Sequence, residues 1–174
     1  MLAALLGVGV GLGVALASES TIPPLPFVYG GAGGSPAQAR CPERSYVAGL
    51  RVFHDGTTVA GAALLCRADT DRRRRFEGAL FGQRNAREER LECDDGWVAV
   101  GIWGAAGGLV DRLSLMCAAR KALAGPVRHL RPVGGTGGGG FRAWCPVGQG
   151  LTGLFGAAGQ LLDRVAPICR APHD

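Results

Sequence analysis

An internal repeat with a period of 52 residues restricts the fold of this sequence more than any other feature. Three sets of landmarks share the period: Cys41, Cys93 and Cys145; Gly30, Gly82 and Gly134; and Gly49, Gly101 and Gly153. A second cysteine of each unit keeps the spacing to within one residue: Cys66, Cys117 and Cys169. We predict three tandem units, over about residues 27–66, 79–117 and 131–169. Such repeats are typical of architectures in which several small units share one core.

Each unit has the pattern of a β-hairpin preceded by a glycine-rich strand or loop pair. In the second unit, residues 97–103 and 109–116 are runs of strand-forming residues on either side of a glycine-containing turn. Long helices are not expected in a chain with 30 glycines among 174 residues, because each interior glycine costs a helix about 1 kcal/mol. We therefore predict an all-β domain with about four short strands in each unit and twelve in all.

The N-terminal segment has the composition of a signal peptide. Residues 1–17 carry no charge and end in Ala15-Leu16-Ala17, a small-x-small pattern typical of a signal-peptidase site. A membrane anchor is the less favoured alternative, because 17 helical residues reach only about 25 Å across a hydrocarbon core of roughly 30 Å. We predict cleavage after Ala17 and a secreted mature chain, residues 18–174, without a membrane span.

Because secreted proteins fold in an oxidising compartment, we predict that the six cysteines form a disulfide framework. Only one pairing treats the three units alike and closes each hairpin: Cys41–Cys66, Cys93–Cys117 and Cys145–Cys169. Closing a ring of about 25 residues stabilises a fold by roughly 3.5 kcal/mol in the loop-entropy model. A zinc site is the disfavoured alternative, because the sequence has no close C-x-x-C pair, and no metal or cofactor is predicted.

The features of each unit also follow one order along the chain. A glycine-rich opening precedes Cys-Pro or its equivalent, an apolar strand with a central glycine, and an Asp-containing strand that ends on cysteine. This order, clearest over residues 30–66 and 134–169, resembles the repeat of the vitelline membrane outer layer protein I family. The resemblance implies a β-prism, in which three four-stranded Greek-key sheets pack around a pseudo-threefold axis. It also implies an extracellular setting, often an egg coat or a secretory fluid.

Residues 131–135 and 151–163 of the third unit are similar to the end of a jacalin-related lectin, the other large β-prism family. In mannose-binding members of that family, a G-x-x-x-D turn offers backbone N–H groups and the Asp carboxylate to sugar hydroxyls. The pattern occurs here at residues 107–111 and 159–163, whereas residues 56–60 of the first unit lack the Asp. The resemblance implies that each Asp-bearing turn lies near the glycine-rich segment of the next unit, the third turn facing the first segment.

Two carbohydrate sites are predicted on this basis. One consists of Gly159, Gln160, Leu161 and Asp163 with Gly30 and Gly31; the other consists of Gly107, Gly108, Leu109 and Asp111 with Gly134 and Gly135. In the structural alternative, each Asp caps its own turn or pairs with the adjacent Arg112 or Arg164. The third combination, residues 56–60 with 82–86, lacks both the Asp and most of the glycines, as a lost site would.

Other residues with side-chain chemistry are assigned to the core or the surface. Trp103 and Trp144 are expected in the core, and Trp97 is the better candidate for exposure. The three histidines are expected at the surface: His54, His129 and His173. The arginine run 72–75, together with Arg67, could bind a polyanion or be cleaved by a protease, but a solvated linker is favoured.

The sequence offers little for catalysis or for binding nucleic acid. No Ser or Cys lies in a nucleophile motif, and the disulfides would use every thiol. The net charge is +5, but neither a recognition helix nor an aromatic-basic pattern accompanies it. We predict a secreted, non-catalytic carbohydrate-binding protein with glycans or glycoproteins as partners. The alternatives are a structural protein of an extracellular coat or matrix and, less favoured, a glycan-processing transferase, an activity associated with the vitelline membrane family.

Overall fold

The computed structural model describes residues 27–69 and 74–172, and every element in this part of the chain is a β-strand. The strands are β1 (Tyr29–Gly30), β2 (Ser35–Arg40), β3 (Ser45–His54), β4 (Val59–Ala68), β5 (Arg75–Gly82), β6 (Arg87–Glu92), β7 (Trp97–Ala106), β8 (Val110–Ala119), β9 (Val127–His129), β10 (Val133–Gly134), β11 (Gly139–Trp144), β12 (Gly150–Ala158) and β13 (Leu162–Arg170). The all-β prediction is confirmed. No helix that could cross a bilayer occurs among the described residues. The predicted signal peptide, Arg72, Arg73 and His173 lie outside them.

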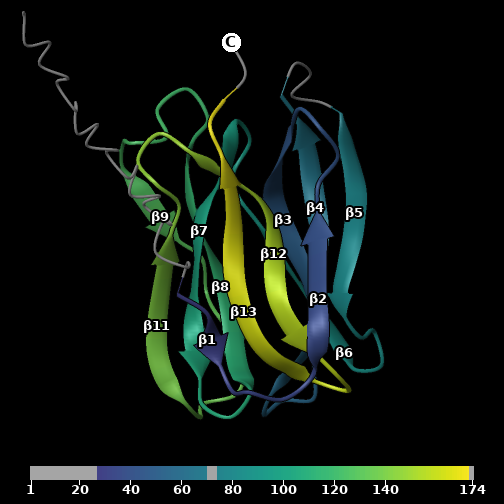
Figure 1. The fold of residues 1–174 in the computed structure, drawn as a ribbon. Coiled ribbons are helices and arrows are strands. Elements are labelled where there is room, and N and C mark those ends of the chain that lie inside the picture. Colours follow the sequence, from purple (N-terminus) through teal and green to yellow (C-terminus); the bar gives the residue numbers. More distant parts are fainter. Residues whose placement is uncertain (1–26, 70–73, 173–174) are drawn as a thin grey trace, which may run out of the picture.

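The strands form three antiparallel sheets (Figure 1). The first sheet has the order β5-β4-β3-β6, the second β10-β8-β7-β11 with β9 also paired to β8, and the third β1-β13-β12-β2. A hairpin of two long strands occupies the centre of each sheet. In the first sheet, this hairpin is β3 and β4. The next strand, β5, pairs with β4, and the last strand, β6, pairs with β3. The other two sheets repeat this Greek-key order. The predicted β-prism of Greek-key sheets is therefore confirmed.

The sheets do not coincide with the sequence repeats. Each sheet combines the hairpin of one repeat with the two outer strands that open the next, and the third sheet takes β1 and β2 from the beginning of the chain. The strand count also differs from the predicted twelve, since thirteen are present in the described residues. The outer strand of the second sheet is divided into β9 and β10 near Pro132, which has no N–H to donate to a sheet.

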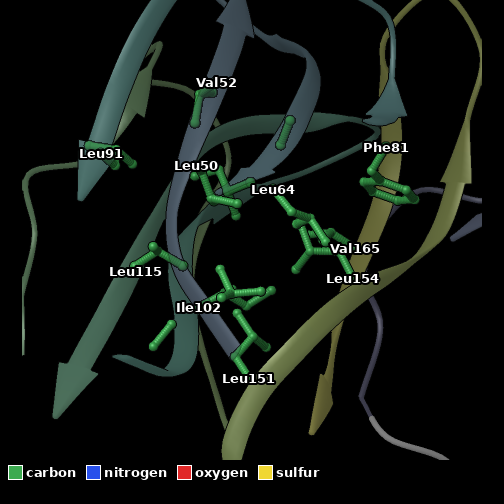
Figure 2. Close-up of a cluster of buried hydrophobic side chains, with 14 of the residues drawn as sticks. Leu50, Val52, Leu64, Phe81, Leu91, Ile102, Leu115, Leu151, Leu154 and Val165 are labelled. Atoms are coloured by element: carbon green, nitrogen blue, oxygen red, sulfur yellow. The ribbon is translucent and has the colours of Figure 1, made fainter. Parts of the chain in front are cut away.

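One hydrophobic core lies between the inner faces of the three sheets (Figure 2). It is built from sets of equivalent residues, one from each repeat, with no exposed surface: Val47, Ala99 and Leu151; Leu50, Ile102 and Leu154; and Val59, Val110 and Leu162. Because every set draws on all three repeats, no single repeat can bury its apolar side chains alone.

The recurring glycines mark places where two backbones approach closely. Gly49, Gly101 and Gly153 each lie at a register shift within the central hairpin of a sheet. A Cβ atom at Gly101 would lie 2.5 Å from the carbonyl oxygen of Ala143 on the neighbouring strand. Only glycine fits such a β-bulge, so this landmark of the repeat serves the architecture.

The three disulfides have the predicted pairing, Cys41–Cys66, Cys93–Cys117 and Cys145–Cys169. No described cysteine is free, so the zinc alternative is wrong. The bonds do more than close hairpins. Cys41 follows β2 of the third sheet and is bonded to Cys66 in β4 of the first sheet, and the other two bonds repeat this arrangement around the molecule. Each bond therefore lies within one repeat but connects two sheets, and together they form a ring.

Candidate functional site

Asp163 lies at the start of β13, directly after the turn of residues 159–161, and faces the glycine-rich segment of residues 30–34. Its carbonyl oxygen accepts a hydrogen bond of 2.8 Å from the backbone N–H of Gly31. Its two carboxylate oxygens lie against Gly33 and Gly34, where any Cβ atom would collide with them. The segment is therefore a cradle for the carboxylate that only glycines can form.

Asp111 repeats this geometry at the start of β8. Its carbonyl oxygen accepts a hydrogen bond of 2.8 Å from the N–H of Gly135, and a Cβ atom at Gly137 would lie 2.6 Å from Oδ1. Gly138 lies against the other carboxylate oxygen. The structure thus brings together the turn and the glycine-rich segment of both predicted sites.

Both carboxylates are half-buried, and neither has a hydrogen-bond or ion-pair partner among residues 27–69 and 74–172. The adjacent arginines are engaged elsewhere. Arg112 Nη1 donates to the carbonyl oxygen of Gly135 at 3.4 Å, and Arg164 Nη1 donates to that of Gly31 at 3.3 Å. The structural alternative, in which each Asp caps its turn or pairs with the neighbouring arginine, is therefore not the arrangement found.

The corresponding turn of the first repeat uses its aspartate differently. Asp55 lies before the turn, and its Oδ1 accepts hydrogen bonds from the N–H groups of Thr57 at 2.7 Å and Thr58 at 2.8 Å. Hydrogen bonds from the side chain of Thr57 and from these N–H groups hold the pKa of the Asp55 carboxyl well below its usual range. The backbone contact between the turn and the next segment is kept, because the N–H of Gln83 donates to the carbonyl oxygen of Ala60. The carboxylate of Asp55, however, is hydrogen-bonded to its own turn.

The two candidate sites adjoin each other. Gly31 of the Asp163 site is in close backbone contact with Gly108 of the Asp111 turn. The apolar side chains of the turns are half-buried, and Leu161 packs against the small cluster formed by Phe53, Ala60 and Ala63. Gln160, by contrast, is exposed. Each site therefore offers a carboxylate in a glycine cradle next to partly covered apolar surface.

The tryptophans lie differently from the prediction. Trp144 is 49% exposed, because β11 alternates and directs Phe141 and Ala143 into the core, so its assignment to the core is wrong. Trp103 is half-buried but packs against a separate small cluster on the outer face of the second sheet. Trp97 is half-buried and packs against the main core, so it is not the exposed tryptophan that the sequence predicted.

Two further surface assignments also change. His54 is 6% exposed, with Nε2 at 3.1 Å from Glu89 Oε1, so its surface prediction is wrong, whereas His129 is exposed as predicted. Arg67 is 3% exposed and donates to the carbonyl oxygens of Asp94 and Trp97, so it is not part of a solvated run. Burial lowers the pKa of its guanidinium.

Comparisons with solved structures find the same fold in lectins. Malaysian banana lectin has a TM-score of 0.62 at 16% identity, covering 83% of this chain and 96% of that one. A prostate-specific WGA16 glycoprotein lectin has a TM-score of 0.61 at 18% identity, covering 83% of this chain and 96% of that one. A mannose-binding jacalin-related lectin from Ananas comosus has a TM-score of 0.61 at 16% identity, covering 84% of this chain and 96% of that one. Neither a family model nor a curated protein sequence matches the chain. The chain thus has the fold of jacalin-related lectins, and membership of the vitelline membrane family stays a prediction.

Proposed function

We propose that this protein is a secreted, non-catalytic lectin that binds sugars at Asp163 and Asp111. The observation that carries the proposal is the pair of carboxylates, each set in a glycine cradle and left without an intramolecular partner in the described residues. A half-buried carboxylate of this kind accepts hydrogen bonds from neighbouring hydroxyls of one sugar ring. Glycines beside it allow the ring to approach the backbone.

The comparisons support a hexose of the mannose type as the ligand. Artocarpin, which has been solved in complex with methyl α-mannose, shares this fold with a TM-score of 0.60 at 16% identity, over 83% of this chain and 97% of artocarpin. Because the identity is low, the ligand of artocarpin enters as a proposal for this chain. The geometry of the two sites supports this ligand, since each site places a carboxylate next to partly covered apolar surface.

Calorimetric titration with methyl α-mannoside tests the sites. Asp163→Ala and Asp111→Ala should each remove one binding event, and the double variant should remove both. Losing one charged hydrogen-bond partner costs about 1.5–3 kcal/mol, a roughly ten- to hundredfold drop in affinity. Asp55→Ala is the matched control, because the Asp55 carboxylate accepts hydrogen bonds from the backbone of its own turn, in the first repeat. Unchanged binding by a folded double variant would refute the site assignment.

Secretion is tested separately on the full-length chain. Expression in a cell with a secretory pathway should release protein whose N-terminal sequence begins at Ser18. Released protein that still begins at Met1 would contradict cleavage, and protein retained in the cell membrane would favour the anchor alternative.

A further inference from the structure

The outer face of the second sheet carries a group of aromatic side chains that takes no part in the two sugar sites. Trp103 on β7 and Trp144 on β11 both contact His129 on β9 edge-to-face, with ring centroids 5.7 and 6.0 Å apart. These strands lie together on the left of Figure 1. Arg142, which precedes Trp144 by two residues on β11, is opposite Trp103 in the register. We call these four residues the aromatic strip.

The fold itself does not require aromatic residues at these positions. The equivalent positions on the outer face of the first sheet, one period earlier, are all charged: Arg51, Glu77, Arg90 and Glu92. There, each arginine is paired with a glutamate, at 2.6 and 2.8 Å. The charges of the first sheet are thus neutralised within the sheet. At these four positions the second sheet instead has three rings and one arginine.

Two hollows adjoin the aromatic strip. One, of about 350 Å³, is lined by Trp103, Gly104, Arg112, Gly140, Phe141 and Arg142. The other, of about 220 Å³, lies between Trp144 and Val147 on one side and Leu123 on the other. No acidic side chain lines either hollow. In the part of the chain that the structure describes, Arg142 has no ion-pair partner.

We propose that the aromatic strip is a second carbohydrate-binding surface, specific for acidic saccharides. The exposed indole ring of Trp144 can stack on the apolar C–H face of a pyranose ring, and the two hollows beside the strip give room for the sugar. The guanidinium of Arg142 forms paired hydrogen bonds with a planar carboxylate or with a sulfate group of the same saccharide. Uronic acids and sulfated sugars share this chemistry.

The charge of the strip disfavours a second copy of the chain as its occupant. A twofold contact would place this face against itself, because both partners of such an interface use the same patch. Each Arg142 would then meet a face without an acidic side chain, and its charge would lose water without gaining a partner. An anionic ligand supplies the missing charge.

Titration of the full mature chain with two acidic hexasaccharides tests the proposal: an oligogalacturonate, which carries carboxylates, and a heparin fragment, which also carries sulfates. At least one should bind, and its affinity should fall as salt rises. Trp144→Ala and Arg142→Gln should each weaken binding about tenfold or more. Arg90→Gln, the equivalent position on the first sheet, should leave the affinity within twofold. Because Arg142 is exposed, its substitution also tests the proposal if the Trp144 variant does not fold.

The outcome is independent of the mannose-type sites. The Asp111→Ala, Asp163→Ala double variant should keep its affinity for the acidic hexasaccharide while losing methyl α-mannoside. Failure of methyl α-mannoside binding alone would therefore refute only the first proposal. The second is overturned if neither hexasaccharide binds, if Arg142→Gln binds as the unmodified protein does, or if sedimentation shows a dimer that Arg142→Gln or Trp144→Ala dissociates.

Discussion

At the scale of single residues, the two candidate sugar sites depend on glycines whose missing side chains make room for a carboxylate. Gly137 is the clearest case, because a Cβ atom there would lie 2.6 Å from Asp111 Oδ1 and otherwise meet only that same side chain. Gly139, two residues later, has only the carbonyl oxygen of Ala106 nearby, at 3.9 Å. One segment thus holds a glycine that shapes the site and a glycine that does not.

Gly137→Ala should therefore displace the Asp111 carboxylate without disturbing the sheet. We expect the affinity of that site for methyl α-mannoside to fall about tenfold, since part of a charged hydrogen bond is lost. The melting temperature should change little. Gly139→Ala is the control and should keep both properties. Equal losses in the two variants would show that the segment responds to any added side chain and that the cradle is not specific.

At the scale of strands and sheets, the outer face of the first sheet is held by ion pairs. Arg51 contacts both Glu77 and Glu88 at 2.6 Å. Hydrogen bonds from Arg84 and Arg51 lower the pKa of Glu77, and the two hydrogen bonds from Arg51 lower the pKa of Glu88. A carboxyl whose pKa is lower in the folded state stabilises the fold above its unfolded pKa of about 4.3. This stabilisation is lost as the pH falls through the folded value.

Acid titration of stability checks these ion pairs. The midpoint of urea unfolding should fall between about pH 5 and pH 3, and it should fall less steeply in a Glu77→Gln, Glu88→Gln double variant. Glu43→Gln is a suitable control, because Glu43 is exposed and has no ion pair in the described residues. A double variant with the same acid dependence as the unmodified protein would mean that exposed pairs of this kind contribute nothing measurable.

The disulfides connect elements of different sheets, so each should matter to the whole prism. Replacing Cys93 and Cys117 together by alanine should lower the free energy of unfolding by about 2–5 kcal/mol. The equivalent change at Cys145 and Cys169 should cost a similar amount, because both bonds close rings with a sequence separation of 24. Urea unfolding of the two variants measures this. If removing either disulfide left the free energy of unfolding unchanged, that disulfide would not stabilise the prism, and the prediction would be wrong.

Much of this arrangement could be predicted from the sequence, and the failures have physical causes. The repeat gave the hairpins and the disulfide partners, because equivalent residues occupy equivalent positions in a symmetric fold. It could not show that the outer strands of one repeat join the sheet of the preceding one, since strand pairing leaves no local pattern. Trp144 was misplaced because a neighbouring cysteine says nothing about which face of an alternating strand a residue occupies.

The candidate site, like the fold, could be predicted only in part. The juxtaposition of each Asp turn with the next glycine segment followed from the resemblance, and the structure has it. The freedom of the two carboxylates was not predictable, because Arg112 and Arg164 could equally have paired with them. The aromatic strip was missed as well, because its rings come from strands far apart in the sequence.

At the scale of the whole molecule, the three sheets share one core, and the third sheet is completed by strands from the beginning of the chain. Leu50, Ile102 and Leu154 are equivalent, fully buried residues from the three repeats. All 3 tryptophans, by contrast, lie in the second sheet, on β7 and β11. Tryptophan fluorescence therefore reports on one sheet only, while the core connects all three.

This asymmetry allows a test of whether the prism unfolds as one unit. If it does, Leu50→Ala in the first sheet should shift the unfolding curve seen by tryptophan fluorescence as far as Ile102→Ala in the second. Each change deletes a buried aliphatic side chain and should cost about 2–5 kcal/mol. Far-UV circular dichroism, which reports on all sheets, should give the same midpoints. A Leu50→Ala variant that shifts the circular dichroism curve but leaves the fluorescence curve in place would show that the sheets unfold separately, in spite of their common core.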